Sequence, residues 1–137
     1  MEFSSVLQQS LTAQVAFRKP LADCLDDAIK QVFQVKAKDE IKIIDAGAGT
    51  GLMAVELIKL GYTNLHALDI SQEMLNEAKK KNLYKNIICA PLNEQRIAEI
   101  ETGEFDAMIC GGTLFKGLVR ASALVEMVRM VRTSKFF

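Results

Sequence analysis

The chain has 137 residues, half of them hydrophobic, which is enough for one domain with a buried core. Basic and acidic residues are equally numerous, 17 of each, so no excess of positive charge favours nucleic acid or an anionic membrane as a partner. No apolar run approaches the roughly 18 residues of a membrane span, and the first residues lack the basic start and apolar stretch of a signal peptide. We therefore expect a cytoplasmic protein without a membrane partner, and nothing indicates nucleic-acid binding.

The predicted elements alternate between helix and strand along the chain. The expected helices cover residues 20–35, 52–60, the segment that follows Ser71, 93–100 and 121–131, and the expected strands cover 41–46, 65–70, 86–90 and 105–110. Such an alternation indicates an α/β fold with a parallel sheet and right-handed crossovers. Ligands of these sheets bind at the carboxyl ends of the strands.

Local signals define several helix ends and faces. Pro20 suits the first turn of the first helix, Gly61 ends the second, and Ser71 is expected to cap the third. Lys79, Lys80 and Lys81 are expected to form a solvated helix face. The apolar side chains expected to face inward are Leu21, Leu25, Ala28, Ile29 and Val32 in the first helix and Leu124, Val125, Val128 and Val131 in the last.

The three cysteines, Cys24, Cys89 and Cys110, are odd in number and widely spaced, with no C-x-x-C pair. This pattern predicts neither a disulfide framework nor a metal site, and we expect three small buried side chains in a reducing compartment. The single histidine, His66, falls in an expected strand and has no apparent catalytic partner, which favours a structural role.

The expected strand 41–46 runs into a glycine-rich turn whose spacing separates three kinds of nucleotide site. A P-loop requires Gly-Lys-Ser or Gly-Lys-Thr, and neither occurs in the chain. A dinucleotide loop, G-x-G-x-x-G, fails at its third position, where Leu52 stands. The remaining pattern, D-x-G-x-G-x-G, comprises Asp45, Gly47, Gly49 and Gly51, and its glycines allow the backbone to approach a ligand closely.

Two acidic residues indicate the charge of that ligand. Asp45 stands at the strand end, where it would repel a phosphate but attract a cation. Asp69 follows Gly49 by 20 residues, at the end of the second expected strand, where a carboxylate can accept hydrogen bonds from ribose hydroxyls. A nucleoside with ribose, positive charge and no phosphate is S-adenosylmethionine, which is the predicted cofactor.

The segments IKIIDAGAGTG, ALDISQEML and EFDAMICGG resemble successive motifs of the class I S-adenosylmethionine-dependent methyltransferases. With CLDDAIK and NLYKNIICAPL, the similarity covers residues 17 to 132. It implies a Rossmann-like three-layer fold with strand order 3-2-1-4-5-7-6, of which strands 5, 7 and 6 are missing. We therefore expect one partial domain over 1–137, with an amino-terminal segment 1–16, a cofactor-binding core 17–132 and a truncated tail 133–137.

The resemblance also implies site residues. The glycines would form the loop under the methionine part and the ribose, Asp45 would hold that loop or orient the amino group, and Asp69 would bind the ribose diol. A family acid near the adenine amino group is replaced by the turn Ala90-Pro91-Leu92, so that contact would come from backbone or be absent. The other residues expected at the cofactor are Ile70, Met74, Leu92, Cys110 and Gly111. No catalytic side chain is expected, because methyl transfer depends chiefly on alignment.

Two alternative functions remain at this point. The chain could be an inactive binding or dimerisation module, because strand four would be an exposed apolar edge able to pair with another chain. An NAD-dependent oxidoreductase is disfavoured by Leu52. The methyl acceptor is not encoded in any motif, and the neutral net charge favours a small molecule.

Overall fold

The computed structural model describes the backbone of residues 3–110 and 121–132, with side chains described from Phe17 onward. Four parallel strands form one sheet in the order β3-β2-β1-β4. Their bounds are Ile43–Ala46 for β1, Leu65–Asp69 for β2, Asn86–Cys89 for β3 and Ala107–Ile109 for β4. This order confirms the predicted 3-2-1-4 arrangement, and each strand lies within its predicted range.

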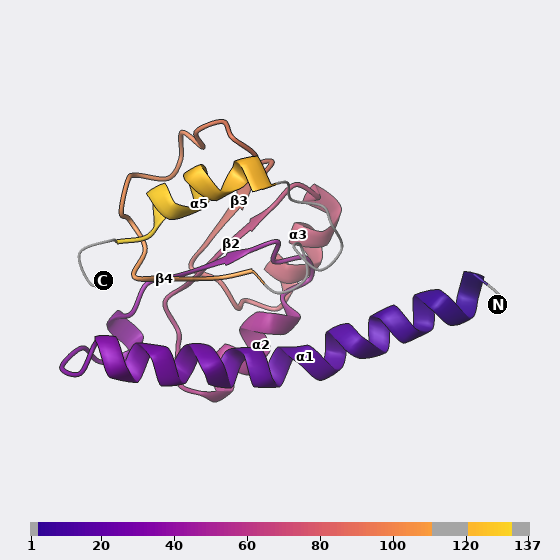
Figure 1. Ribbon diagram of the computed structural model, residues 1–137, viewed down its shortest axis with the longest axis horizontal. Coiled ribbons are helices and arrows are strands. Elements are labelled where there is room, and N and C mark those ends of the chain that lie inside the picture. The colour runs from indigo at the N-terminus through magenta and orange to yellow at the C-terminus, as the bar shows by residue number, and fades with distance from the viewer. Residues whose placement is uncertain (1–2, 111–120, 133–137) are drawn as a thin grey trace.

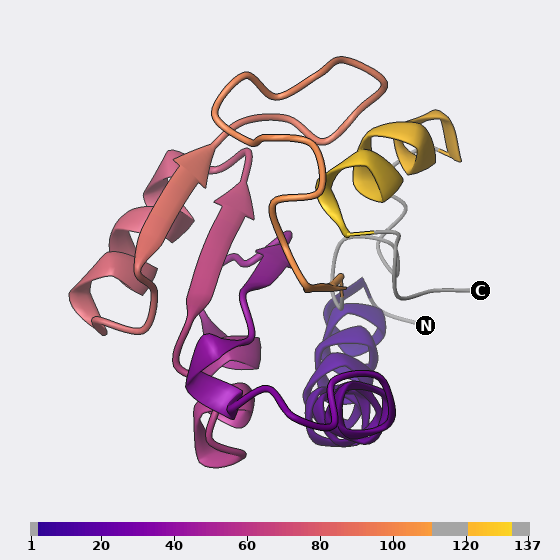
Figure 2. The same cartoon turned by 90° about the vertical axis from the view of Figure 1, so that its left-hand side faces the viewer.

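Helices cover both faces of the sheet, with α1 and α2 on one side and α5 on the other (Figures 1 and 2). Their bounds are Phe3–Val32 for α1, Leu52–Lys59 for α2, Gln72–Lys80 for α3 and Leu124–Met130 for α5, with short 3-10 turns at Lys38–Glu40 and Ala121–Ala123. All four residues of β1 are buried, as expected for a parallel strand that is covered on both faces.

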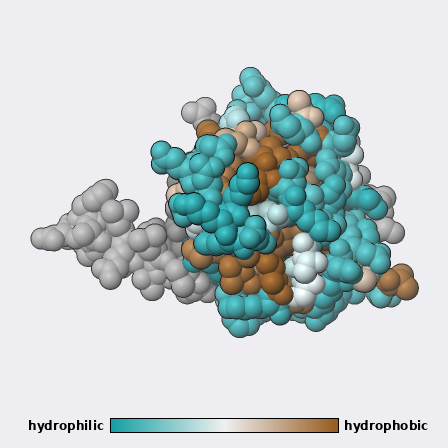
Figure 3. All heavy atoms as spheres, turned by 180° about the vertical axis from the view of Figure 1, so that it is seen from behind, coloured by the Kyte–Doolittle hydropathy of each residue, from teal (hydrophilic) through white to brown (hydrophobic). Residues whose placement is uncertain are grey.

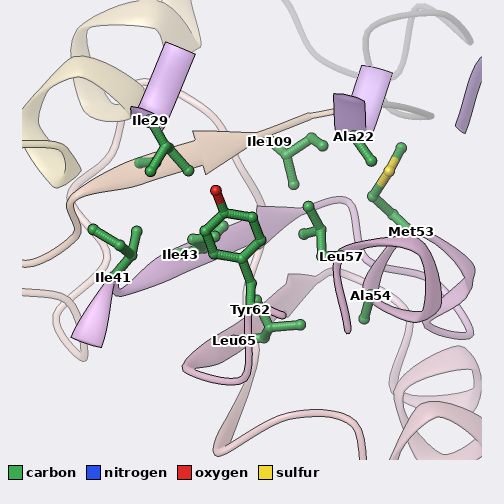
Figure 4. Close-up of a cluster of buried hydrophobic side chains, with 11 residues drawn as sticks. Ala22, Ile29, Ile41, Ile43, Met53, Ala54, Leu57, Tyr62, Leu65 and Ile109 are labelled. Carbon is green, nitrogen blue, oxygen red and sulfur yellow. The ribbon is translucent and has the colours of Figure 1, made fainter. Parts of the chain in front are cut away.

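A hydrophobic core attaches α1 and α2 to one face of the sheet (Figure 4). Tyr62 is fully buried in it, and its hydroxyl donates a hydrogen bond of 2.5 Å to Asp26 of α1. The other buried members are Ala22, Ile29, Ile41, Ile43, Met53, Ala54, Leu57, Leu65, Ala107 and Ile109. Because this core fixes α2 against β1, it also fixes both ends of the loop that joins them.

Helix α1 begins well before the predicted start. Pro20 lies inside the helix, so its predicted place in the first turn is wrong. Proline removes one backbone hydrogen bond and crowds the preceding turn, which bends a helix without necessarily ending it. Figure 1 shows α1 bending along its length, with its amino-terminal part projecting beyond the sheet. Ala28, predicted to face inward, is exposed, whereas Ile29 is buried as predicted.

The helix predicted over residues 93–100 is absent, and this segment consists of bends and turns. Side chains of α5 bond its backbone groups instead. Glu126 accepts from the Ile97 N–H at 2.7 Å, and Arg129 donates to the carbonyls of Ile97 and Ile100 at 3.2 and 2.9 Å. Because these groups have partners outside a helix, the segment can bury Ile97 and Ile100 without regular structure.

The inward face of α5 also differs from the prediction. Leu124, Val125 and Val128 are exposed, and the buried residues of this segment are Ala123, Glu126, Met127 and Met130. Glu126 pairs with Arg129, its neighbour one turn along the helix. A buried carboxylate held by an ion pair and a backbone N–H therefore turns the helix away from the face that hydropathy favours.

The predicted burial of the cysteines is wrong, because Cys24 and Cys89 are exposed and Cys110 is half-buried. Cys24 lies on the outer side of α1, and Cys89 ends β3, a strand at the edge of the sheet. His66 lies in β2 as predicted and is buried there, with Nε2 2.9 Å from the Asn64 side-chain oxygen and its ring against Phe105. Burial lowers the pKa of His66 below its ordinary value, which fits a neutral structural residue.

The outer edge of β4 is paired just before the strand begins. Phe105 forms a parallel bridge with Val131, and Arg132 N–H donates to the Phe105 carbonyl at 2.8 Å. Val131 and Arg132 therefore pair, as a strand would, with the residue Phe105 that precedes β4. Self-association through the rest of this edge stays a prediction, as do the domain boundaries.

The surface seen from behind is mostly hydrophilic, with hydrophobic patches between the polar side chains (Figure 3). Within the described residues, no helix is both long enough and apolar enough to cross a membrane.

Candidate functional site

The glycine loop, residues 47–51, joins β1 to α2 at the carboxyl edge of the sheet. Gly47, Gly49 and Gly51 have φ values of 74°, 57° and 94°, a region that side-chain-bearing residues rarely adopt. The loop folds over the end of β2, because the N–H groups of Gly47 and Ala48 donate to the Leu68 carbonyl at 2.7 and 3.0 Å. The three glycines are therefore required by the backbone conformation.

Gly49 and Gly51 differ in what surrounds them. A Cβ at Gly51 would lie 2.9 Å from Leu83 Cδ1 and 3.4 Å from a ring carbon of Tyr84, so this glycine allows close packing inside the protein. A Cβ at Gly49 would meet Met74 Sδ at an ordinary 3.7 Å. Of these two glycines, Gly51 is the one fixed by protein packing, whereas Gly49 lies beside the side chain of Met74.

Asp69 links the glycine loop to the start of α3. Its Oδ2 accepts from Gly49 N–H and its Oδ1 from Ser71 N–H, both at 2.8 Å. Ser71 in turn caps α3 by accepting from Met74 N–H at 3.3 Å, as predicted. A carboxylate has about four lone-pair sites, so these two bonds leave acceptor capacity at the half-buried Asp69.

Asp45 lies buried near the end of β1, two residues before the glycine loop. Its Oδ2 accepts a 2.6 Å hydrogen bond from the Tyr84 hydroxyl. Burial raises the pKa of Asp45 to about 7; the Tyr84 hydrogen bond opposes this rise, and the charge of Asp69 adds to it. Near neutral pH this carboxyl therefore exists in both protonation states.

The predicted apolar residues at the ends of β2 and β3 lie at the same edge of the sheet. Ile70 is 70% exposed and Met74 is 44% exposed, so both large apolar side chains are accessible at this edge. Cys89 lies next to Ile70, with its thiol 3.5 Å from the Ile70 carbonyl.

The remaining predicted residues divide into two groups. Leu92 and Cys110 are half-buried and pack against the core on the α5 side, whereas Pro91 is exposed. Gly111 lies outside the described residues, so its expected contact with the cofactor stays a prediction.

Sequence reasoning missed three residues that contact the glycine loop from the end of α3. Lys81 Nζ donates to the Thr50 carbonyl at 2.8 Å, although its side chain is exposed as predicted. Leu83 and Tyr84 pack against Gly51. The available signal was the pair Leu83-Tyr84 directly after a helix end, since an apolar and an aromatic residue there must be covered by a neighbouring element.

The electrostatics of this edge suit a cationic ligand. Neither Asp45 nor Asp69 has a basic side chain bonded to it within the described part of the chain. Over the same residues, no three His, Cys, Asp or Glu side chains form a group suited to a metal ion. The half-buried Asp69 can therefore accept from hydroxyl donors, and the negative charge of the two acids favours a ligand that carries positive charge.

Comparisons with known proteins agree with this geometry. A family model described as a methyltransferase domain matches residues 43–134. The chain is 32% identical over 117 residues to methyltransferase-like protein 27 of Homo sapiens, an alignment that covers 84% of this chain and 45% of the relative. The chain thus spans less than half the length of that relative.

Solved structures show the same fold. A TehB-like SAM-dependent methyltransferase from Corynebacterium glutamicum matches with a TM-score of 0.59 and 20% identity, covering 93% of this chain and 66% of that one. The plantazolicin methyltransferase BpumL, solved in complex with SAH, matches with a TM-score of 0.63 and 18% identity, covering 92% and 46%.

Proposed function

Since this chain belongs to the S-adenosylmethionine-dependent methyltransferase family, we propose that it holds S-adenosylmethionine at the glycine loop and transfers its methyl group to an acceptor. The observation that supports this most strongly is the convergence of Asp45 and Asp69 on one glycine loop, without a basic side chain bonded to either among the described residues. Two acids placed in this way favour a ligand with positive charge and disfavour a phosphate.

The two acids have different roles in this proposal. Asp69 accepts hydrogen bonds from the ribose hydroxyls while it keeps the glycine loop closed through Gly49. Asp45 holds the loop and orients the positively charged amino group of the methionine part. Gly47 and Gly49 bring the backbone close to the ligand, whereas Gly51 acts through its packing against Leu83.

Apolar residues at the strand ends complete the proposed site. Ile70 and Met74, whose side chains are exposed, pack against the adenine. The backbone at Pro91 and Leu92 bonds the adenine amino group, in place of an acidic side chain. Cys110, which directly follows β4, lies nearest the reactive methyl group, and the contact expected of Gly111 stays a prediction.

When bound, S-adenosylmethionine supplies a methyl group that its sulfonium already activates for in-line displacement. The residues of the chain contribute alignment, because a rigid loop and two fixed carboxylates restrict how the methyl donor lies. We assign no general acid or base. A small-molecule acceptor fits the neutral net charge, and a reducing compartment such as the cytoplasm fits the exposed free thiols of Cys24 and Cys89.

Calorimetric titration of the 137-residue chain with S-adenosylhomocysteine tests the proposal, with NAD as the control ligand. We expect S-adenosylhomocysteine to bind and NAD not to bind. Asp69→Ala should weaken S-adenosylhomocysteine binding about 10- to 100-fold, the effect of losing hydrogen bonds to a charged group. A folded chain that binds NAD, or binds neither ligand, would contradict the proposal.

A further inference from the structure

We propose that Tyr84 is a positioning residue for the cofactor, which holds the Asp45 carboxylate beside the glycine loop and couples cofactor binding to the ionisation of that carboxylate. This inference rests on the proposed function, because it concerns the same site.

Tyr84 reaches Asp45 across the strand that lies between them. Tyr84 precedes β3, whereas Asp45 lies in β1, and β2 separates these two strands in the sheet. In the register of the sheet, Asp45 is opposite Ala67, a small residue of the buried cluster against which Tyr84 packs. The small residue leaves room for the ring, and the hydroxyl then donates to Asp45 Oδ2 at 2.6 Å. One carboxylate oxygen is thereby fixed in place.

The same segment holds the glycine loop at two further points. Leu83 and Tyr84 fill the space that the missing Cβ of Gly51 leaves open, and Lys81 donates to the Thr50 carbonyl. These contacts join residues about 30 positions apart, so the loop conformation depends on the segment 81–84. Tyr84 is the one member that contacts both the loop and a carboxylate of the site.

The groups that act on Asp45 can be named for each packed element. Asp69 of β2 is a like charge that disfavours its ionisation, and the Tyr84 hydroxyl is a donor that favours it. β4 contributes Ile109 opposite Asp45, and the first turn of α2 contributes only apolar residues. Lys81, at the end of α3, is committed to the Thr50 carbonyl. Tyr84 is thus the favourable partner of the Asp45 carboxylate among these elements.

A cationic ligand beside such a carboxyl binds best when the carboxyl is ionised. Because burial raises the pKa of Asp45 to about 7, part of the free protein carries the protonated form at neutral pH. Binding of a positive group stabilises the ionised form, so a proton leaves the protein when the ligand binds. Removing the Tyr84 hydroxyl takes away the donor that favours ionisation and shifts the free protein further toward the protonated form.

The test is titration of the wild-type chain, Tyr84→Phe and Tyr62→Phe with S-adenosylhomocysteine from pH 5.5 to 8. Wild-type affinity should rise with pH. Tyr84→Phe should bind about fivefold more weakly at pH 7, the effect of raising the pKa of a half-ionised carboxyl by about one unit, and its affinity profile should shift to higher pH. Tyr62→Phe is the matched control. It removes a tyrosine hydroxyl that also donates to a buried aspartate, but this aspartate, Asp26, does not belong to the glycine loop site. The binding profile of Tyr62→Phe should match that of the wild type.

The outcomes separate this inference from the proposed function. Failure of the wild type to bind overturns both. Normal wild-type binding, with an unshifted profile in folded Tyr84→Phe, overturns only the inference. If circular dichroism shows that Tyr84→Phe does not fold, the test uses proton release by the wild type. Calorimetric titration of the wild type at pH 7, in phosphate and in Tris, should reveal release of roughly half a proton per ligand bound. The absence of proton release would contradict the inference.

Discussion

Two buried aspartates of this chain each accept a hydrogen bond from a tyrosine, yet only one of them is paired with cations. Asp26 of α1 accepts from Tyr62 at 2.5 Å and lies 3.0 Å from Lys30 Nζ and 3.4 Å from Lys38 Nζ. Asp45 of β1 accepts from Tyr84 at 2.6 Å, and the charged group that acts on it most is the acidic Asp69.

The difference appears in their ionisation. Burial alone would raise the pKa of Asp26, but hydrogen bonds from Tyr62, Lys30 and Lys38 bring it below the ordinary value. Burial raises the pKa of Asp45 to about 7 because its single tyrosine donor cannot offset it. The charge of Asp26 is thus balanced by partners within the fold, whereas that of Asp45 is not, which fits the proposed role of Asp45 toward a cationic ligand.

The largest effect is expected for Asp45→Asn, which removes the unpaired charge. A folded pKa of about 7, above the ordinary 3.8, means that the folded state binds more protons between these values, so wild-type stability falls as pH rises through that window. At pH 8 the variant should be more stable than the wild type by about 4 kcal/mol, with the difference disappearing near pH 4. Urea denaturation at both pH values measures it, and a difference that does not depend on pH would contradict the assignment.

A smaller effect is expected for Gly51→Ala, which disturbs the packing of Tyr84. The new Cβ would lie 2.9 Å from Leu83 at a φ of +94°, so overpacking and backbone strain should destabilise the fold by about 2–3 kcal/mol. Gly49→Ala is the matched control, since it shares a positive φ but meets its neighbour at 3.7 Å. Denaturation midpoints should therefore fall more for Gly51→Ala, and equal losses would show that strain alone, without packing, is responsible.

The smallest effect is expected for Asp26→Asn, the counterpart of the first change. It removes a charge that the fold already neutralises, so stability at pH 7 should fall by about 1–2 kcal/mol. The pKa of Asp26 is lowered in the fold, so its contribution is present above the ordinary value of 3.8 and is lost as pH falls through the folded value. The two Asp→Asn changes should thus have opposite signs at pH 8 in the same denaturation experiment; a gain in stability from Asp26→Asn would remove the contrast.

The glycine loop could be predicted because its signals are local, whereas the prediction of the strand order rests on the resemblance of the motifs to a family. Gly47, Gly49 and Gly51 stand where the backbone requires positive φ, and Asp69 follows at the spacing that brings it to the Gly49 N–H. The roles of these residues toward a cofactor stay predictions, because they concern a ligand and not the fold.

The parts that could not be predicted depend on contacts distant in sequence. The inward face of α5 is set by Glu126, whose carboxylate bonds Ile97 N–H, 29 residues away, and this same contact replaces the helix expected over 93–100. The Tyr84–Asp45 bond joins residues 39 positions apart across an intervening strand. Neither hydropathy nor local turn signals contain such pairings.

The most direct test of the account is an NMR titration of the Asp45 side-chain carboxyl carbon, with and without S-adenosylhomocysteine. We predict that this carboxyl titrates near pH 7 in the free chain and at clearly lower pH in the complex, because the positive amino group of the ligand stabilises the carboxylate. A carboxyl that titrates near 3.8 in the free chain, or one whose titration does not change when the ligand binds, would contradict the role of Asp45 as the charge partner of the cofactor.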